Sequence, residues 1–253
     1  MNSVKGKIIL TSILLFLIFN ACDDDDGYSL SKRWETIATA YPVSGNSYYL
    51  MFDNGEKIGV AASNVTYLPK ANQRIYLNFT YLSDSTNGFD HLVKVNWLAE
   101  ILTKEVIDLT FENQDSIGND PVKIHSLWIG DDYLNIYFGY NYGKQSTHYI
   151  NLVNNTIPDP YPSEGGEIYL EFRHNKNDDP EWYGKNGYAA FDLRKYKEEA
   201  ITKGKDSLKF VIGVLDFGEE YKTYSITYKL NNNTTDIRTS LTYESDDDAT
   251  LFR

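Results

Sequence analysis

The chain has 253 residues and a formal net charge of −12 at pH 7, with 36 acidic residues against 24 Lys and Arg. This balance argues against nucleic acid or an anionic lipid surface as a partner, because both would require a basic stripe on the protein. The 21 Tyr and 12 Phe, together with many Val, Ile and Thr, predict an all-β protein.

The first residues of the chain predict a signal peptide. Lys5 and Lys7 form a positively charged start, and an apolar run extends from Ile8 to Phe19. This run is much shorter than the roughly 20 apolar residues that a membrane-spanning helix requires. We therefore treat residues 1–21 as a leader and exclude them from the fold.

A tether is expected at residues 22–33, which begin with the one cysteine of the chain. The leader and Ala21-Cys22 resemble the lipobox of bacterial lipoproteins, although Phe19 stands where Leu is more common. The resemblance implies that Cys22 carries lipid and that the bilayer is a partner, since two or three acyl chains anchor a protein stably. The alternative is an ordinary secreted protein with a free thiol. A lipidated Cys22 leaves no disulfide, so hydrophobic cores must stabilise the domains.

Four consecutive aspartates, Asp23, Asp24, Asp25 and Asp26, follow the cysteine. This cluster resembles the export signal that sends lipoproteins of Bacteroidetes to the outer face of the outer membrane. It implies a lipid-anchored protein exposed on the cell surface. A plain spacer or a periplasmic orientation is the alternative.

Residues 34–104 predict a small barrel of the OB type. Apolar and polar residues alternate with a period of two, and Asn54-Gly55 is typical of a tight hairpin turn. Val93, Val95 and Trp97 are expected on one face of their strand. The five predicted strands are Trp34 to Tyr41, Ser47 to Phe52, Glu56 to Ala61, Arg74 to Ser83 and Leu92 to Leu98.

Residues 105–232 predict a β-sandwich. The domain boundary is expected near 103–108, where apolar residues become sparse and Asn, Asp and Gly follow. One helix is expected at Arg194 to Lys203, and residues 233–253 form an acidic, polar tail. The seven predicted strands are Val122 to Ile129, Tyr133 to Tyr140, Ser146 to Val153, Glu167 to His174, Gly187 to Leu193, Ser207 to Asp216 and Tyr221 to Leu230.

Short motifs follow one another in a fixed order over nearly the whole mature chain. They begin at Trp34, Asn72, Val93, Ile101, Asp115, Trp128, Tyr133, His148 and Leu170, and read WETIAT, NQR, VKVN, ILTK, DSIGNDP, WIG, YLNI, HYINL and LEFRHN. Their order and spacing resemble the NigD-like lipoproteins of Bacteroidales, although Asn72 stands where Gly is expected. The resemblance implies an OB-like domain followed by a β-sandwich. It supplies no catalytic mechanism and no functional residues, and the family name comes from a product of a bacteriocin locus.

The sequence contains no recognisable catalytic, cofactor or metal-binding motif. His91, His125, His148 and His174 are far apart, and no pair has the spacing of metal ligands. No nucleophile elbow, phosphate-binding glycine loop or dinucleotide fingerprint is present. We therefore predict no enzyme activity, no cofactor and no metal, with a glycan-active enzyme built on two carboxylates as the alternative. Each histidine is expected to have a hydrogen-bonded structural role.

The loop at residues 175–187 is the best candidate for ligand contact. It places Trp182 and Tyr183 in a polar, turn-rich setting. Exposed aromatic side chains in such a setting can stack on a sugar or anchor a protein partner. In the alternative interpretation, Trp182 caps the sandwich core.

Three Asp-Ser-x tripeptides resemble the acceptor sequence for general O-glycosylation in Bacteroides. The candidate sites are Ser85, Ser116 and Ser207, all expected in loops or at strand edges, where a glycan would be tolerated. The alternative is a chance occurrence in a chain rich in Asp.

The sequence therefore predicts a lipid-anchored, two-domain binding or interaction module at the outer membrane, with a glycan or a protein as ligand. Two alternatives from other classes are a bacteriocin immunity or envelope-defence lipoprotein and a glycan-active enzyme. The ligand and the oligomeric state stay open.

Overall fold

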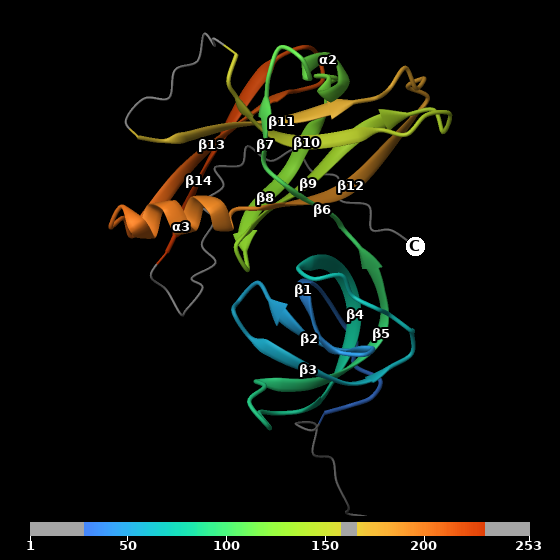
Figure 1. The fold of residues 1–253 in the computed structure, drawn as a ribbon. Helices are drawn as coiled ribbons and strands as arrows, with labels where there is room; N and C mark the ends of the chain where they lie inside the picture. The colour runs from blue at the N-terminus through green and yellow to red at the C-terminus, as the bar shows by residue number, and fades with distance from the viewer. Residues whose placement is uncertain (1–27, 158–165, 231–253) are drawn as a thin grey trace, which may run out of the picture.

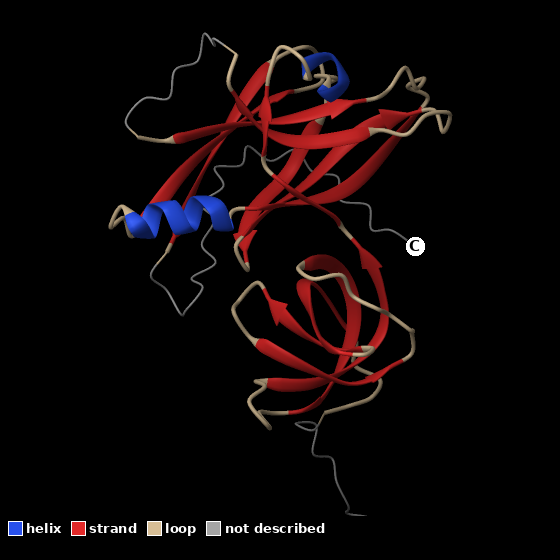
Figure 2. Cartoon of the chain, in the orientation of Figure 1, coloured by secondary structure: helices blue, strands red, loops and turns tan. Residues whose placement is uncertain are grey.

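A computed structural model describes residues 28–157 and 166–230 of the chain (Figure 1). Strands dominate it, and they form a closed barrel that joins a two-layered sandwich (Figure 2). The all-β prediction, with an OB-like barrel followed by a β-sandwich, is confirmed. The leader at 1–21, the lipidation site Cys22, the acidic signal Asp23–Asp26 and the tail at 233–253 lie outside the described residues.

The first five strands close into a barrel in the order β1-β2-β3-β5-β4. Inward side chains such as Leu50, Ile58 and Leu77 are fully buried, as the alternation predicts. The β2–β3 hairpin turns at Gly55, which has a φ of 87° and donates its N–H to the carbonyl of Phe52 at 2.9 Å. The strands are β1 (Trp34–Ser44), β2 (Ser47–Phe52), β3 (Lys57–Ser63), β4 (Gln73–Ser83) and β5 (His91–Glu100).

Trp97 faces the opposite way from its prediction. Val93 and Val95 are fully buried, but Trp97 is 40% exposed. The pairing of β5 with β4 shifts by one residue at Asn96, which forms a β-bulge. A bulge reverses the alternation of the residues that follow it, so Leu98 packs against the barrel core in place of Trp97.

The remaining strands form the two sheets of the sandwich, ordered β14-β13-β11-β10-β7 and β6-β12-β9-β8. All seven strands predicted here are present, and the predicted helix is α3. Strands β6 and β7 were not predicted from the sequence, because both are short and pair in parallel with strands that are distant in the chain. The elements are β6 (Leu102–Glu105), β7 (Ile107–Leu109), α2 (Gln114–Ile117), β8 (Lys123–Gly130), β9 (Tyr133–Tyr142), β10 (Tyr149–Asn155), β11 (Ile168–Asn175), β12 (Tyr183–Asp192), α3 (Arg194–Thr202), β13 (Ser207–Leu215) and β14 (Tyr221–Lys229).

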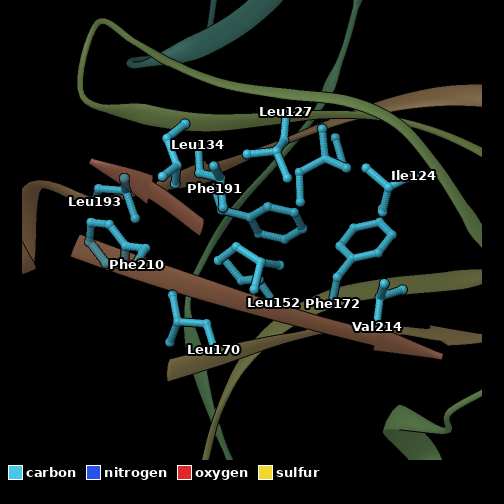
Figure 3. Close-up of a cluster of buried hydrophobic side chains, with 14 of the residues drawn as sticks. Ile124, Leu127, Leu134, Leu152, Leu170, Phe172, Phe191, Leu193, Phe210 and Val214 are labelled. Carbon is cyan, nitrogen blue, oxygen red and sulfur yellow. The ribbon is translucent and has the colours of Figure 1, made fainter. Parts of the chain in front are cut away.

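The sandwich core lies between the two sheets (Figure 3). Phe172 of β11 packs against Phe138 and Phe191 of the opposite sheet, with ring centroids 5.0 Å and 6.0 Å away. Phe210 of β13 contacts Tyr196, so α3 covers one end of this core. With no disulfide expected, this interdigitated apolar layer is the main source of stability in the domain.

The barrel and the sandwich meet without a linker. Strand β5 ends at Glu100 and β6 begins at Leu102, so the chain passes directly from one domain into the other. Ile37 and Ile101 pack against Tyr133 and Ala190 of the sandwich. The outer face of the β6-β12-β9-β8 sheet therefore rests on the barrel.

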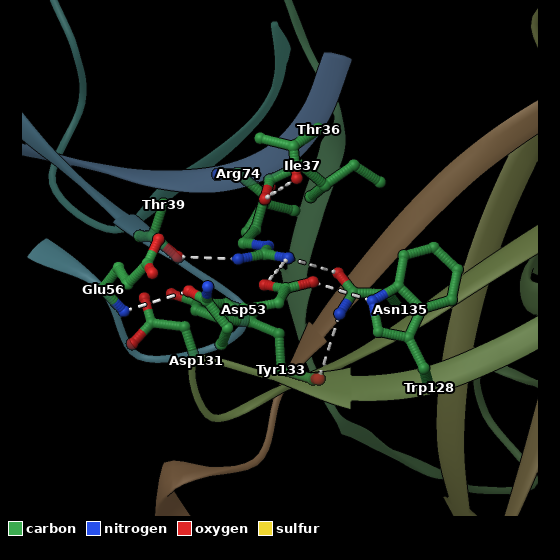
Figure 4. A network of polar contacts seen from close by, with 12 residues as sticks. Thr36, Ile37, Thr39, Asp53, Glu56, Arg74, Trp128, Asp131, Tyr133 and Asn135 are labelled. Carbon is green, nitrogen blue, oxygen red and sulfur yellow. Dashed lines mark hydrogen bonds and ion pairs between the residues drawn. The ribbon is translucent and has the colours of Figure 1, made fainter. Parts of the chain in front are cut away.

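A buried arginine lies at the centre of this contact (Figure 4). The side chain of Arg74 is 0% exposed, and its Nη2 lies 2.6 Å from Oδ1 of Asp53 and 3.0 Å from Oδ1 of Asn135. Its Nη1 donates to Oγ1 of Thr39 at 3.0 Å. Trp128 of β8 donates its Nε1–H to the other oxygen of Asp53 at 2.7 Å. Asp53 thus joins the arginine of the barrel to the tryptophan of the sandwich.

Two backbone positions allow the domains to approach this closely. A Cβ at Gly130 would lie 2.2 Å from the carboxyl carbon of Asp53, so only glycine fits there. Asn72 has a φ of 62°, in the left-handed region that Asn adopts more readily than most residues, and its carbonyl accepts the hydroxyl of Tyr133 at 3.0 Å. Asn72 stands where glycine is expected, and because it adopts the same left-handed conformation, the turn is preserved.

Replacing the buried arginine should destabilise the whole chain. Arg74→Met should lower the free energy of unfolding by about 3–5 kcal/mol, because Asp53 then keeps a largely buried charge without its cation. Urea denaturation followed by tryptophan fluorescence measures this change. The control is Lys70→Met at a side chain that is 77% exposed, where a change of about 0.5 kcal/mol or less is expected. Equal effects of the two substitutions would contradict the role of Arg74.

Candidate functional site

Two loops lie side by side at one end of the sandwich, at the upper right of Figure 1. One loop, residues 143–148, joins β9 to β10, and the other, residues 176–182, joins β11 to β12. The second loop contains Asp179, which is 2% exposed, and ends at the predicted contact residue Trp182. The carboxylate of Asp179 reaches across to the first loop.

Asp179 fastens the two loops together. Its Oδ1 accepts the backbone N–H groups of Gln145 at 2.7 Å and Ser146 at 2.9 Å. Its Oδ2 accepts the N–H of Gly143 and lies 3.0 Å from Nε2 of His148. Burial by itself would raise the pKa of this carboxyl, but the four N–H donors outweigh it and hold the pKa of Asp179 well below its usual range. We call this arrangement the Asp179 clamp.

A second histidine, His174, extends the hydrogen-bond network of the clamp. Nδ1 of His148 and Nε2 of His174 are 2.8 Å apart, and Tyr140 packs beside both rings. His174 is 2% exposed, so it lies in the interior of the domain. Burial, together with the nearby His148, lowers the pKa of His174 to about 4, so it is neutral at pH 7. Because Asp179, His148 and His174 are all buried, the group holds the loops and presents no reactive side chain to solvent.

The strand ends and loops around the clamp carry an exposed patch of aromatic and basic side chains. We call it the loop patch: ring contacts link Tyr142, Lys144, Tyr183 and Lys185, and Trp182 directly precedes Tyr183 in the chain. Trp182 is 62% exposed and Tyr183 is 54% exposed, so the alternative in which Trp182 caps the core is wrong. The rings of Tyr142 and Tyr183 lie 6.1 Å apart. Nζ of Lys144 lies 5.2 Å from the Tyr183 ring, and Nζ of Lys185 lies 5.3 Å from the Tyr142 ring.

The three candidate glycosylation sites are separated in the fold. Ser85 is exposed between β4 and β5, and Ser207 is exposed at the first residue of β13. Ser116 is also exposed, but it lies in the short helix α2, where its Oγ donates to the carbonyl of Asn113 at 2.8 Å. That site therefore differs from the loop or strand edge expected for it.

An aromatic row crosses the junction of the two domains, and it was not predicted from the sequence. It runs from Trp97 and Tyr76 of the barrel to Tyr188, Tyr137 and His125 of the sandwich, with neighbouring ring centroids 4.7 to 5.9 Å apart. Tyr188 stacks between its two neighbours at interplanar angles of 14° and 23°. The row therefore joins the two domains through the stacked rings of Tyr76 and Tyr188.

Arg173 and Glu171 form a largely buried ion pair. Glu171 is 3% exposed and accepts hydrogen bonds from Arg173 at 2.6 Å and from Asn155 at 2.9 Å. Arg173 and Asn155 also line a surface depression of about 490 Å³ together with Leu109 and Ile157. The two charges of the pair neutralise each other, so we assign no ligand there.

Within 28–157 and 166–230, no three His, Cys, Asp or Glu side chains come together in a way that would hold a metal ion. In the same part of the chain, no helix is both long enough and apolar enough to cross a membrane.

Comparison with known proteins matches both domains. Residues 37–101 match the NigD-like N-terminal OB domain, and residues 105–228 match the NigD-like C-terminal beta sandwich domain. No match was found among the curated proteins.

Several solved structures share the fold. A protein of Parabacteroides distasonis ATCC 8503, provisionally described as toxin-related, is 36% identical over 79% of this chain and 95% of that one, with a TM-score of 0.67. A NigD-like immunity protein of Bacteroides caccae ATCC 43185 is 21% identical over 80% of this chain and 99% of that one, with a TM-score of 0.60. A protein of Bacteroides fragilis NCTC 9343, provisionally described as a lipoprotein, is 13% identical over 79% of this chain and 100% of that one, with a TM-score of 0.56. The last two establish a common fold only.

The buried histidine predicts a pH dependence of stability. His174 takes up a proton near pH 6.5 in the unfolded chain but only near pH 4 in the folded chain, so the free energy of unfolding should fall as the pH is lowered between these values. The contribution of this group approaches about 1.4 kcal/mol per pH unit. Urea denaturation at a series of pH values measures it. His174→Gln should flatten the dependence and the control His91→Gln should not, and equal slopes in both variants would contradict the assignment.

Proposed function

The chain belongs to the NigD-like family, and from this premise we propose that it is a binding module of the cell envelope that contacts its ligand through the loop patch. Lipid on Cys22 holds it at the outer membrane, and Asp23 to Asp26 direct it to the cell surface. The proposal assigns the protein no catalytic reaction and no cofactor. Its partners are the bilayer and a glycan or protein ligand.

The Asp179 clamp is the observation that carries this proposal. Exposed aromatic side chains on mobile loops would lose conformational entropy on binding, whereas the loops here are fastened by one carboxylate before any ligand arrives. Large aromatic residues that remain exposed are typical of binding surfaces. Trp182 and Tyr183 meet this description, because both are more than half exposed and lie next to the fastened loop.

The proposed location rests on the beginning of the chain. The leader and Ala21-Cys22 resemble a lipobox, and the Bacteroides fragilis structure of the same fold is provisionally described as a lipoprotein. Two or three acyl chains on Cys22 would anchor the protein stably.

A second candidate function is immunity, in which the protein binds a toxin at the envelope before it acts. The observation that favours it is the similarity to the toxin-related protein of Parabacteroides distasonis and to the immunity protein of Bacteroides caccae. Under this reading the loop patch binds a protein rather than a glycan. A strain that lacks the chain separates the two functions: hypersensitivity to a toxin of a sibling strain supports immunity, and a growth defect on one glycan supports nutrient capture.

Truncating the exposed tryptophan should weaken ligand binding. The purified chain with Cys22→Ser is screened against glycans and envelope components, and Trp182→Ala should weaken the binding that is found by at least about tenfold. Trp34→Ala is the matched control, because Trp34 is 53% exposed on the barrel, and it should leave binding unchanged. Unchanged binding by Trp182→Ala would remove the loop patch as the contact site.

Neutralising the acidic cluster should change the location of the protein. Replacing Asp23, Asp24, Asp25 and Asp26 by Asn should make the chain resistant to protease added to intact cells, while lipidation of Cys22 continues. Lysed cells provide the control, since the chain must be digested equally there. Protease sensitivity that stays as in the wild type on intact cells would disprove the proposed surface signal.

A further inference from the structure

The loop patch carries positive charge on an acidic protein. The whole chain has a formal net charge of −12, yet Lys144 and Lys185 both lie in the patch. Within residues 28–157 and 166–230, neither lysine has a carboxylate within ion-pair distance. Their ammonium groups contact only the rings of Tyr142 and Tyr183, so both keep their charge for a ligand.

The carboxylates of the same loop are already engaged elsewhere. Asp179 is buried in the clamp. Glu181 pairs with Lys176, and Asp178 lies close enough to Lys176 to help raise the pKa of its ammonium group. The acidic residues nearest to the patch therefore do not neutralise Lys144 and Lys185.

The patch also offers an apolar surface. Trp182 is 62% exposed, so much of its indole is open to solvent. A small inorganic anion would pair with the two ammonium groups but would leave the indole of Trp182 exposed to water. A ligand that fills the whole patch needs negative charge and a flat, weakly polar face in the same molecule.

From this combination, and resting on the proposed binding function, we infer that the ligand of the loop patch is an anionic glycan, a polymer of sugar rings that bear carboxylate or sulfate groups. The apolar face of one ring packs on Trp182. The acidic group of that ring or its neighbour pairs with the ammonium groups of Lys144 and Lys185. Charge complementarity selects the anionic polymer over a neutral one, and the net negative charge of the rest of the chain keeps polyanions from binding non-specifically.

The inference is tested with two anionic polymers and one neutral polymer. Polygalacturonate supplies carboxylates, heparin supplies sulfates and dextran supplies neither, and binding of each to the purified chain with Cys22→Ser is measured by calorimetry. We expect binding of polygalacturonate or heparin that weakens as NaCl is raised, and no binding of dextran. Which anionic polymer binds more tightly distinguishes the carboxylate from the sulfate.

Charge-removing variants locate the binding site. The double variant Lys144→Gln/Lys185→Gln should weaken the binding of the anionic polymer by at least about tenfold. The matched control, Lys195→Gln/Lys205→Gln, removes two exposed lysines in and after α3, at the other end of the sandwich, and should change binding by about twofold or less (Figure 1). Unfolding curves of both variants should overlay that of the parent chain, since all four side chains are exposed.

Several outcomes would overturn the inference. It fails if the chain binds neither anionic polymer, if dextran binds equally well, or if both double variants lose binding to the same extent. It also fails if inorganic sulfate, polyglutamate or vesicles of phosphatidylglycerol bind as tightly as the polymers, because charge alone then explains the result. If Trp182→Ala abolishes binding of a neutral glycan or a protein while the lysine variant binds normally, the proposed function stands and only the anionic class is wrong. If Trp182→Ala changes no binding at all, the proposed function fails as well.

Discussion

The contact between Arg74 and Asp53 is the constraint on which the arrangement of the two domains depends. A fully buried guanidinium must meet its acceptors in one geometry, because removing a charge from water costs several kcal/mol and only close, well-directed partners offset that cost. The partners come from both domains, since Asp53 and Thr39 belong to the barrel and Asn135 to the sandwich. The Nε–H of Arg74 is left without a hydrogen-bond partner among the described residues, so part of the cost of burying the guanidinium is not compensated. The stacked rings of Tyr76 and Tyr188 support the same orientation from the side.

The alternation of apolar residues predicted most of the fold because it depends only on neighbours along the chain. The seven sandwich strands from β8 to β14 and the five barrel strands follow it. Trp97 was misplaced because one inserted residue, Asn96, reverses the pattern, and the inserted residue has no sequence mark of its own. Strands β6 and β7 were missed because their partners, β12 and β10, are far away in the sequence and give no local signal.

The candidate site could be predicted only in part, for a related reason. Trp182 and Tyr183 stand out because large aromatics are unusual in a run of Asn, Asp, Gly and Lys. The two lysines of the loop patch did not stand out in the sequence, because lysine side chains are exposed in most proteins. The clamp was invisible as well, because Asp179 and His148 lie on different loops and only the folded sheets bring them together. The exposure of the two aromatic side chains could thus be predicted from the sequence, whereas the clamp that holds their loop in place could not.

The missing linker between β5 and β6 has a consequence for the order in which the chain folds. The barrel strands pair within a short span, as where Trp34 meets Phe79, so that domain can close soon after its last strand has emerged. Strand β6 follows at once, but Leu102 pairs with Ala189, and the outer sheet stays incomplete until most of the second domain is present. Closing so long a loop is slow compared with forming local pairs, because the entropy of the intervening chain is lost before the contact forms. We therefore expect the barrel to form before β6 has its partner strand, and the hydrogen bond from Arg74 to Asn135 to form late in folding.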